Sequence, residues 1–204
     1  MQRLRKGERL VLATHNPGKV REMQALLSPY GIELVSAGDL GLAVPEETET
    51  TFVGNATLKA MAAANGSGLT ALSDDSGIEI AALDGAPGVV SADWAGSDKD
   101  FSRAMQRVHD SMVARGAEFG AGALANFTSV LCLAYPGDPA QCFEGKVFGH
   151  LVWPPRGANG FGYDPIFVPD GHQRTFGEMT ADEKHRISHR AVAFAKFADA
   201  CLER

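Results

Sequence analysis

The chain has 204 residues, a length that indicates one domain, which we predict to span residues 1–204. Of these residues 45% are hydrophobic and 22% are charged, as is ordinary for a soluble globular protein. The formal net charge of -6 argues against nucleic acid or an anionic membrane as the main partner. A small anionic substrate remains compatible with this charge, because a local basic site or a metal can override the average.

The three cysteines, Cys132, Cys142 and Cys201, are far apart and form no Cys-x-x-Cys pair. We therefore predict that they form neither a disulfide nor a thiolate zinc site, and that the protein is in a reducing compartment. The apolar run Leu10–Ala13 that follows the basic start is too short for a signal peptide, and no segment approaches transmembrane length. The expected location is the cytoplasm, with no membrane contact.

The chain begins with a predicted strand, loop and helix. Arg9–Ala13 is an apolar run typical of a buried strand, and Val20–Leu27 has helical spacing of its apolar residues. The loop Thr14–Lys19 between them offers backbone N–H groups, a helix N-terminus and a lysine, which together favour a phosphate site. A plain connecting loop fits equally well. The loop is no Walker A motif, because Ala13 and Val20 stand where that motif needs Gly and Ser or Thr.

The remaining elements are predicted from apolar spacing, caps and turn residues. The first of them are a strand over Ile32–Val35, a loop over Gly38–Glu49, a helix that Thr50 or Thr51 caps and that ends near Asn65-Gly66, and strands over Leu69–Leu72 and Ile78–Leu83. A helix over Asp100–Arg115 follows, and then two antiparallel strands over Phe127–Tyr135 and Cys142–Val152. The last are a glycine-rich loop over Gly160–Pro165, a strand over Ile166–Val168, and helices that begin near residue 181 and at Ser188.

The stretch Ser73–Gly77 is the predicted working centre of the chain. It joins two predicted strands, and α/β proteins usually place their chemistry at strand ends. Asp74 and Asp75 repel each other unless a cation is near, and an oxygen-rich site with few fixed ligands suits Mg²⁺. The alternative is a solvated turn, because Asp, Ser and Gly are turn formers. Likewise, Phe161-Gly162-Tyr163 taken alone fits a packed loop, and His189-Arg190 a solvated helix start.

Five blocks in register resemble the inosine/xanthosine triphosphate pyrophosphatase family. They lie at Ala13–Glu22, Glu46–Ala60, Asp74–Ala92, Gly160–Phe167 and Lys184–Arg190. Their order and spacing make the resemblance specific, although each block alone would be weak. His15 stands where many members have Gly, a departure that bears on the phosphate loop.

The resemblance implies an α/β fold, with a long mixed sheet, flanking helices in two lobes and the active site in the central cleft. It also implies Mg²⁺-dependent hydrolysis of the non-standard purine nucleotides ITP, dITP and XTP to the monophosphate and pyrophosphate. A homodimer is expected on the same ground, with a purine nucleoside triphosphate as partner and no nucleic acid.

The resemblance also assigns residues. Asp75 is the expected base and metal ligand, with Glu46 and Asp74 as further metal ligands or their support. Phe161 is expected to stack on the purine. Arg190, beside His189, is our candidate for reading the 6-keto oxygen, because its side chain has hydrogen-bond donors only. The substrate-binding residues that it implies are Thr14, His15, Asn16, Pro17, Gly18, Lys19, Lys59, Ser76, Phe161, Gly162, Tyr163, Asp164, Lys184, His189 and Arg190.

Three other functions fit parts of the sequence. A Maf-like nucleotide pyrophosphatase shares the fold and acts on other bases. A nucleotide sensor that does not hydrolyse its ligand would keep the pocket, but it gains little from two acids beside phosphates. A nucleic-acid-binding protein is disfavoured by the net charge of -6.

Overall fold

The computed structural model describes residues 3–43 and 45–203; Val44, in the predicted loop Gly38–Glu49, lies outside the described residues. The chain divides into two compact units. The first unit comprises the described residues of Met1–Asp75, Ser129–Gly145 and Arg190–Arg204, and the second comprises Ser76–Thr128 and Lys146–His189. One domain over residues 1–204 stays a prediction.

The described residues form strands, α-helices and short 3-10 helices. The strands are β1 (Arg9–Leu12), β2 (Glu33–Ser36), β3 (Ala71–Ile80), β4 (Leu124–Ala134), β5 (Gln141–Leu151) and β6 (Phe167–Pro169). The α-helices are α1 (Pro17–Leu27), α2 (Phe52–Ser67), α3 (Phe101–Ala114), α4 (Ala181–Ile187) and α5 (His189–Cys201). The 3-10 helices are Ser28–Tyr30, Ala81–Leu83, Gly88–Val90, Asp93–Ala95 and Asp164–Ile166. None of the described helices is both long enough and apolar enough to cross a membrane.

The described strands form one mixed sheet in the order β2-β1-β3-β4-β5-β6. Strand β1 runs parallel to both β2 and β3, whereas β5 and β6 are antiparallel. Because β1 has a parallel neighbour on each side and is covered on both faces, its residues Leu10, Val11 and Leu12 are all buried. The predicted α/β fold with a mixed sheet and flanking helices is confirmed.

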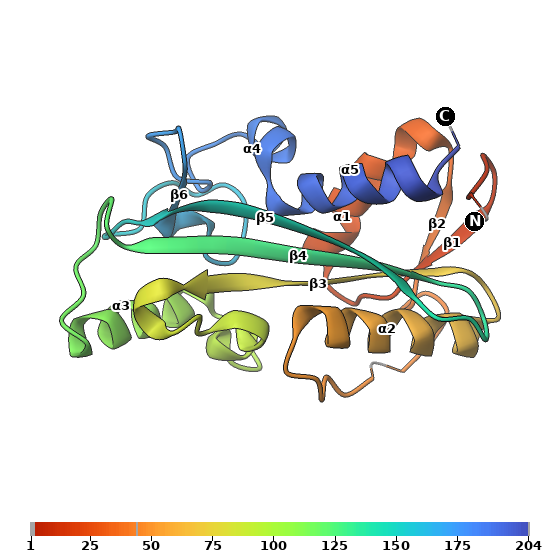
Figure 1. Ribbon diagram of the computed structural model, residues 1–204, viewed down its shortest axis with the longest axis horizontal. Helices are drawn as coiled ribbons and strands as arrows, with labels where there is room; N and C mark the ends of the chain where they lie inside the picture. The colour runs from red at the N-terminus through yellow and green to blue at the C-terminus, as the bar shows by residue number, and fades with distance from the viewer. Residues whose placement is uncertain (1–2, 44, 204) are drawn as a thin grey trace. The chain divides into compact units, whose positions relative to one another are not determined.

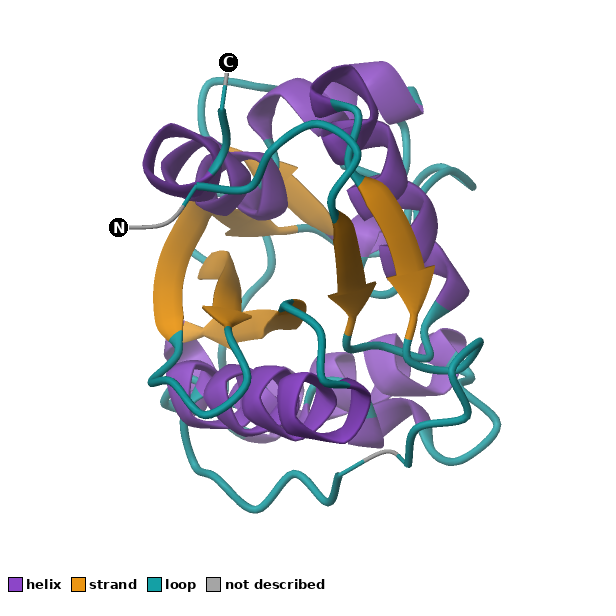
Figure 2. Ribbon diagram, turned by 90° about the vertical axis from the view of Figure 1, so that its right-hand side faces the viewer, coloured by secondary structure: helices purple, strands orange, loops and turns teal. Residues whose placement is uncertain are grey.

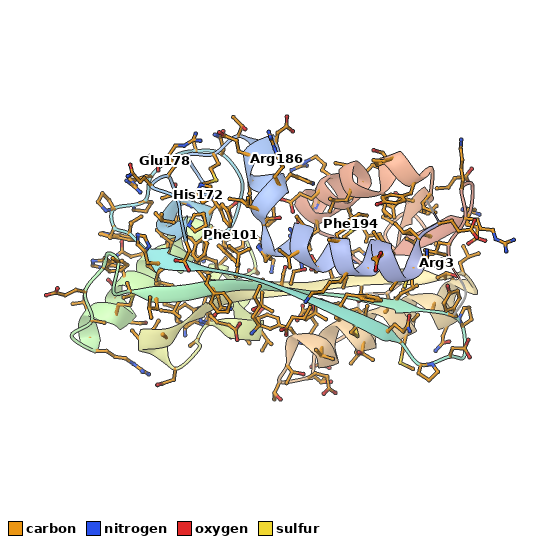
Figure 3. The ribbon with its side chains drawn as sticks, turned by 45° about the horizontal axis from the view of Figure 1, so that its top comes forward. Arg3, Phe101, His172, Glu178, Arg186 and Phe194 are labelled. Atoms are coloured by element: carbon orange, nitrogen blue, oxygen red, sulfur yellow. A yellow bond between two sulfur atoms is a disulfide. The ribbon has the colours of Figure 1, made fainter. Side chains whose placement is uncertain are left out.

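In the first unit, helices cover both faces of the sheet. Figure 1 shows α1 and α5 on one face and α2 on the other, and Figure 2 gives the same arrangement from the side. On the α1 and α5 face, large apolar side chains such as Met23 and Phe197 pack over Leu72. Phe194 of α5, labelled in Figure 3, lies with its ring centroid 6.0 Å from that of Tyr30. The α2 face instead buries small side chains, Ala56, Ala60, Ala63 and Ala64.

The second unit has its own apolar core. Met105, Val108 and Met112 of α3 are buried in it. Asp100 caps this helix by accepting hydrogen bonds from the N–H groups of Ser102 and Arg103. The aromatic rings of Phe127, Phe167 and Phe176 meet in the same core, with centroids 4.9–6.0 Å apart.

The acid pair lies inside a continuous strand, so the prediction of two strands joined at Ser73–Gly77 is wrong. Strand β3 runs unbroken from Ala71 to Ile80. Turn propensity is overridden because the polar side chains find partners on neighbouring elements; the Ser73 hydroxyl, for example, donates to the carbonyl of Ala56 at 2.6 Å. Most of the strand is buried.

The structure joins Cys132 of β4 to Cys142 of β5 in a disulfide, so the prediction that the cysteines form none is wrong. The sequence separation of 10 residues spans the turn between these two strands and leaves the two Cα atoms 4.1 Å apart. The prediction failed because two cysteines that are separated along the chain are neighbours across the two strands. Cys201, in contrast, is a free and buried cysteine of α5.

Candidate active site

The loop between β1 and α1 is organised by its own side chains. Asn16 caps α1, and its Oδ1 accepts hydrogen bonds from the N–H groups of Gly18 at 2.8 Å and Lys19 at 3.3 Å. The Thr14 hydroxyl accepts a hydrogen bond from the N–H of Asn16 at 3.2 Å. Two of the N–H groups that the sequence offered to a phosphate are therefore already used by Asn16. Three residues of this loop are exposed to solvent: His15, Asn16 and Pro17.

Asp74 is held as a fixed negative charge inside the first unit. Its Oδ2 accepts hydrogen bonds from Nε and Nη2 of Arg190 at 3.1 and 2.7 Å, and its Oδ1 accepts one from the Ser129 hydroxyl at 2.9 Å. Burial alone would raise the pKa of Asp74, but the positive charges of Arg190 and Lys19 outweigh it and hold that pKa well below its usual range. Both carboxylate oxygens are thus occupied by protein donors.

Lys19 reaches the same residue from α1. Its Nζ lies 3.3 Å from Oδ2 of Asp74 and donates to the Asp74 backbone carbonyl at 3.1 Å. Burial lowers the pKa of Lys19, and the charge of Asp74 offsets part of that effect. The loop lysine and the acid pair, predicted separately, belong to one group.

Asp75 differs from its neighbour. Its Oδ1 accepts a hydrogen bond from Nζ of Lys59 at 2.6 Å, whereas its buried Oδ2 has no hydrogen-bond partner among the described residues. Burial raises the pKa of Asp75, although the positive charges of Lys59 and Lys19 oppose the shift. A buried carboxylate oxygen without a donor points to a ligand that supplies positive charge or a proton.

A third carboxylate, from the loop before α2, joins this pair. Oε1 of Glu47 lies 3.1 Å from Nζ of Lys59. Burial lowers the pKa of Lys59, but the charges of Asp75 and Glu47 outweigh it and leave that pKa raised. The sequence-predicted ligand was the adjacent Glu46, which is exposed in the same loop.

The donor set fits Mg²⁺ better than a metal that needs a complete protein cage. Within residues 3–43 and 45–203, no group of three or more His, Cys, Asp or Glu side chains is arranged to hold a metal ion. Mg²⁺ takes one or two carboxylates and completes its shell with water and substrate phosphates. The unpaired Oδ2 of Asp75 supplies such a carboxylate.

A separate group in the second unit combines aromatic rings with an ion pair. Oδ2 of Asp164 accepts hydrogen bonds from Nζ of Lys184 at 2.6 Å and from the N–H of Phe161 at 2.8 Å. The same Nζ lies 4.6 Å from the ring centroid of Phe161, a cation–π contact. Asp164 therefore fixes the position of both the ring and the cation.

The other predicted residues of this unit are placed as follows. The ring of His189 stacks on Phe127, with centroids 4.9 Å apart. Tyr163 is buried and its hydroxyl donates to the Ser91 carbonyl at 2.8 Å, which assigns it to the loop's packing. Gly162 takes a φ of +70°, which favours glycine, and Ser76 is half-buried on β3.

The largest difference from the sequence analysis concerns Arg190. Predicted to read the base, it lies buried in the first unit, where Nη1 contacts Glu22 and the other guanidinium donors meet Asp74. Three residues of this group were not predicted as site residues: Glu22, Glu47 and Ser129. Ser129 had a signal, a hydroxyl within the apolar run of β4, whereas the role of Glu22 depends on a partner 168 residues away.

Comparison with known proteins finds the same relatives over nearly the whole chain. The Ham1 family model matches residues 10–200. The chain is 56% identical over 202 residues to the dITP/XTP pyrophosphatase of Bradyrhizobium diazoefficiens, covering 96% of each chain, and 55% identical over 204 residues to that of Ruegeria pomeroyi, covering 99% of each. Among solved structures, it resembles a HAM1 protein from Coxiella burnetii, with a TM-score of 0.86 and 38% identity over 95% of this chain and 98% of that one.

Proposed function

We propose the function of this chain from the fact that it belongs to the Ham1 family. The family resemblance predicted from the sequence is confirmed, and the curated relatives are named as pyrophosphatases. The chain is accordingly a nucleoside triphosphate pyrophosphatase, a hydrolase of non-standard purine nucleotides. In its finer form, the proposal is Mg²⁺-dependent hydrolysis of ITP, dITP and XTP to the nucleoside monophosphate and pyrophosphate.

The observation that carries the mechanism is the unequal treatment of the two neighbouring acids. Asp74 is saturated by protein donors, whereas Asp75 keeps one buried oxygen without a partner among the described residues. A base must have a free lone pair within reach of the attacking water. We therefore assign the reactive role to Asp75 and a positioning role to Asp74.

Asp75 accepts the proton of the attacking water at Oδ2, while Lys59 holds Oδ1 and so fixes the direction of the carboxylate. The pKa of Asp75, raised by burial, makes this carboxylate a stronger base than an exposed aspartate. The water oxygen bonds to the α-phosphorus, and the bond from that phosphorus to the oxygen that bridges the α- and β-phosphates breaks. Pyrophosphate leaves, and the two products together contain the atoms of the substrate and of one water molecule.

For the metal, the proposed ligands are the exposed carboxylates of Glu46 and Glu47 together with Asp75, whose Oδ2 has two lone pairs and could hold the metal with one while the other accepts the proton. Mg²⁺, when bound, neutralises phosphate charge at the reacting group. At the Thr14–Lys19 loop the phosphates would be bound mainly by Lys19, whose Nζ is an ammonium donor at the start of α1, because Asn16 already accepts from the N–H groups of Gly18 and Lys19. A phosphate that took the place of Asp74 as the ion-pair partner of Lys19 would keep the lysine charged, because it also carries negative charge.

For the base, the proposed site is the aromatic group of the second unit. Phe161 offers a stacking surface, and Nζ of Lys184 next to it offers hydrogen-bond donors to an acceptor such as a 6-keto oxygen. Adenine carries a 6-amino donor instead, so ATP would leave one donor facing another. This proposal moves base reading from Arg190 to Lys184.

The test is a substrate panel of dITP, XTP, ATP and dTTP, assayed for pyrophosphate and monophosphate with and without Mg²⁺. We expect release from dITP and XTP that requires the metal, and little from ATP or dTTP. Preferential release from dTTP would instead support the Maf-like alternative. We also propose a cytoplasmic location, as expected from the sequence, and a homodimer, as expected from the family resemblance; light scattering that returned the chain mass of 21.6 kDa at micromolar concentration would refute the dimer.

A further inference from the structure

We propose that Cys132 and Cys142 form a reversible redox site, whose disulfide forms and breaks by exchange with small thiols and disulfides while the chain stays folded. The pair bridges β4 and β5 with its Cα atoms 4.1 Å apart. Because β4 and β5 are hydrogen-bonded neighbours in the sheet, the thiols need not be brought together by a change of fold.

The two cysteine residues differ in their exposure to solvent. Cys132 is completely buried, with 0% of its surface exposed, whereas Cys142 is half-buried. In thiol–disulfide exchange the attacking thiolate must reach a sulfur in line with the bond that breaks. We therefore assign Cys142 as the entry sulfur and Cys132 as the sulfur that leaves.

Thr57 of α2 lies against the pair. Its hydroxyl oxygen is 3.3 Å from Sγ of Cys142 and 3.7 Å from Sγ of Cys132. An O–H donor at this distance stabilises the negative charge that develops on sulfur during exchange. The hydroxyl reaches both sulfurs, so it serves whichever one carries that charge.

The exchange balances with glutathione disulfide as oxidant. A thiolate of Cys142 attacks one glutathione sulfur, forming a mixed disulfide and releasing one glutathione thiolate. The thiol of Cys132 then loses its proton and attacks Sγ of Cys142, releasing the second glutathione. Two thiols of the chain are oxidised and one glutathione disulfide is reduced to two glutathione thiols; reduction of the chain runs the same steps backwards.

The two cysteines and Thr57 lie on elements that also carry hydrogen-bond partners of Asp74 and Asp75. Strand β4 carries Ser129, the donor to Asp74, and α2 carries both Thr57 and Lys59, the partner of Asp75. Disulfides of proteins in reducing compartments are usually transient or redox-sensing. A partly exposed entry cysteine agrees with such a role, and the inference does not depend on the proposed substrate.

The test uses the full folded chain, equilibrated with glutathione and glutathione disulfide at different ratios; the exchange is quenched with acid, and the chain is then unfolded in denaturant, alkylated and weighed. Of its three cysteines, we expect all to be alkylated under reducing conditions and one, Cys201, under oxidising conditions. Oxidation should raise Tm by about 5–10 °C, as expected for closure of a short loop. Three alkylated thiols at every ratio, or a single one even with excess reductant, would overturn the proposal.

Two matched variants test the assignment of entry. With glutathione disulfide, Cys132→Ala should gain one glutathione at Cys142, whereas Cys142→Ala should gain none at the buried Cys132. Equal adducts on both, or none on Cys132→Ala, would refute Cys142 as the entry sulfur. Thr57→Val, which keeps the shape and removes the hydroxyl, should slow exchange at least severalfold; an unchanged rate would exclude the hydroxyl.

Discussion

Arg190 donates two hydrogen bonds to a single oxygen of Asp74, from Nε at 3.1 Å and from Nη2 at 2.7 Å, across a sequence separation of 116 residues. Both side chains are almost completely buried, and Arg190 also contacts Glu22. Removing one partner of such a buried pair typically costs about 3–5 kcal/mol, because the other charge is left without compensation. The pair therefore fixes Asp74 and the strand position of its neighbour Asp75.

The role of Arg190 can be separated from base reading by comparing two variants. Arg190→Lys keeps the charge but loses the forked geometry, so kcat should fall for ITP and ATP alike and their kcat/KM ratio should stay the same. Lys184→Met, in contrast, should narrow that ratio at least tenfold, about the 1.4 kcal/mol of one strong polar contact. A ratio that changed in Arg190→Lys and not in Lys184→Met would reverse the two assignments.

The depressed pKa of Asp74 predicts how stability depends on pH. A carboxylate whose folded pKa lies below its unfolded value of about 3.9 contributes its full stability above that value and loses it as pH falls toward the folded pKa. Asp74→Asn should therefore lower Tm at pH 7, by an amount that shrinks steadily below about pH 4. Asp138→Asn, at an exposed position of the β4–β5 turn, is the control. A gap between wild type and Asp74→Asn that grew in acid would contradict the assigned ion pair.

Gly160 allows Asp164 to hold Phe161 in place. Its φ is +73°, and an added Cβ would collide with the carboxylate of Asp164. Gly160→Ala should therefore raise KM for dITP several-fold by displacing Asp164 and Phe161. Gly171→Ala is a matched control, because its φ is +79° but its Cβ would meet nothing within 4 Å. Both variants should lose similar stability to the strained φ; equal KM changes would show that Asp164 does not position the ring.

Lys19 is expected to act on phosphate charge and not on the base. Lys19→Ala should weaken binding of the triphosphate far more than binding of the corresponding nucleoside, measured by calorimetry. Arg21→Ala, an exposed cation on the same helix, controls for the loss of net charge. An equal loss for both ligands would move Lys19 out of the phosphate site.

Local patterns predicted much of this structure, because caps and apolar spacing act within a few residues. The beginnings of α3 and α4 and the strand, loop and helix around Asn16 are examples. The sequence failed where long-range partners decide the outcome. Turn formers continue as strand β3 because α2 and α5 supply Lys59 and Arg190, and the disulfide depends on strand pairing. No local pattern around Arg190 could show that its donors go to two carboxylates.

The most direct test of the central claim is the turnover of Asp75→Asn with dITP and Mg²⁺, measured beside its melting curve. Asn keeps the shape of the side chain but removes the basic oxygen, so kcat should fall by about 10²–10⁴ while the cooperative melt is retained. A folded variant that kept more than about a tenth of wild-type kcat would contradict the assignment of Asp75 as the base.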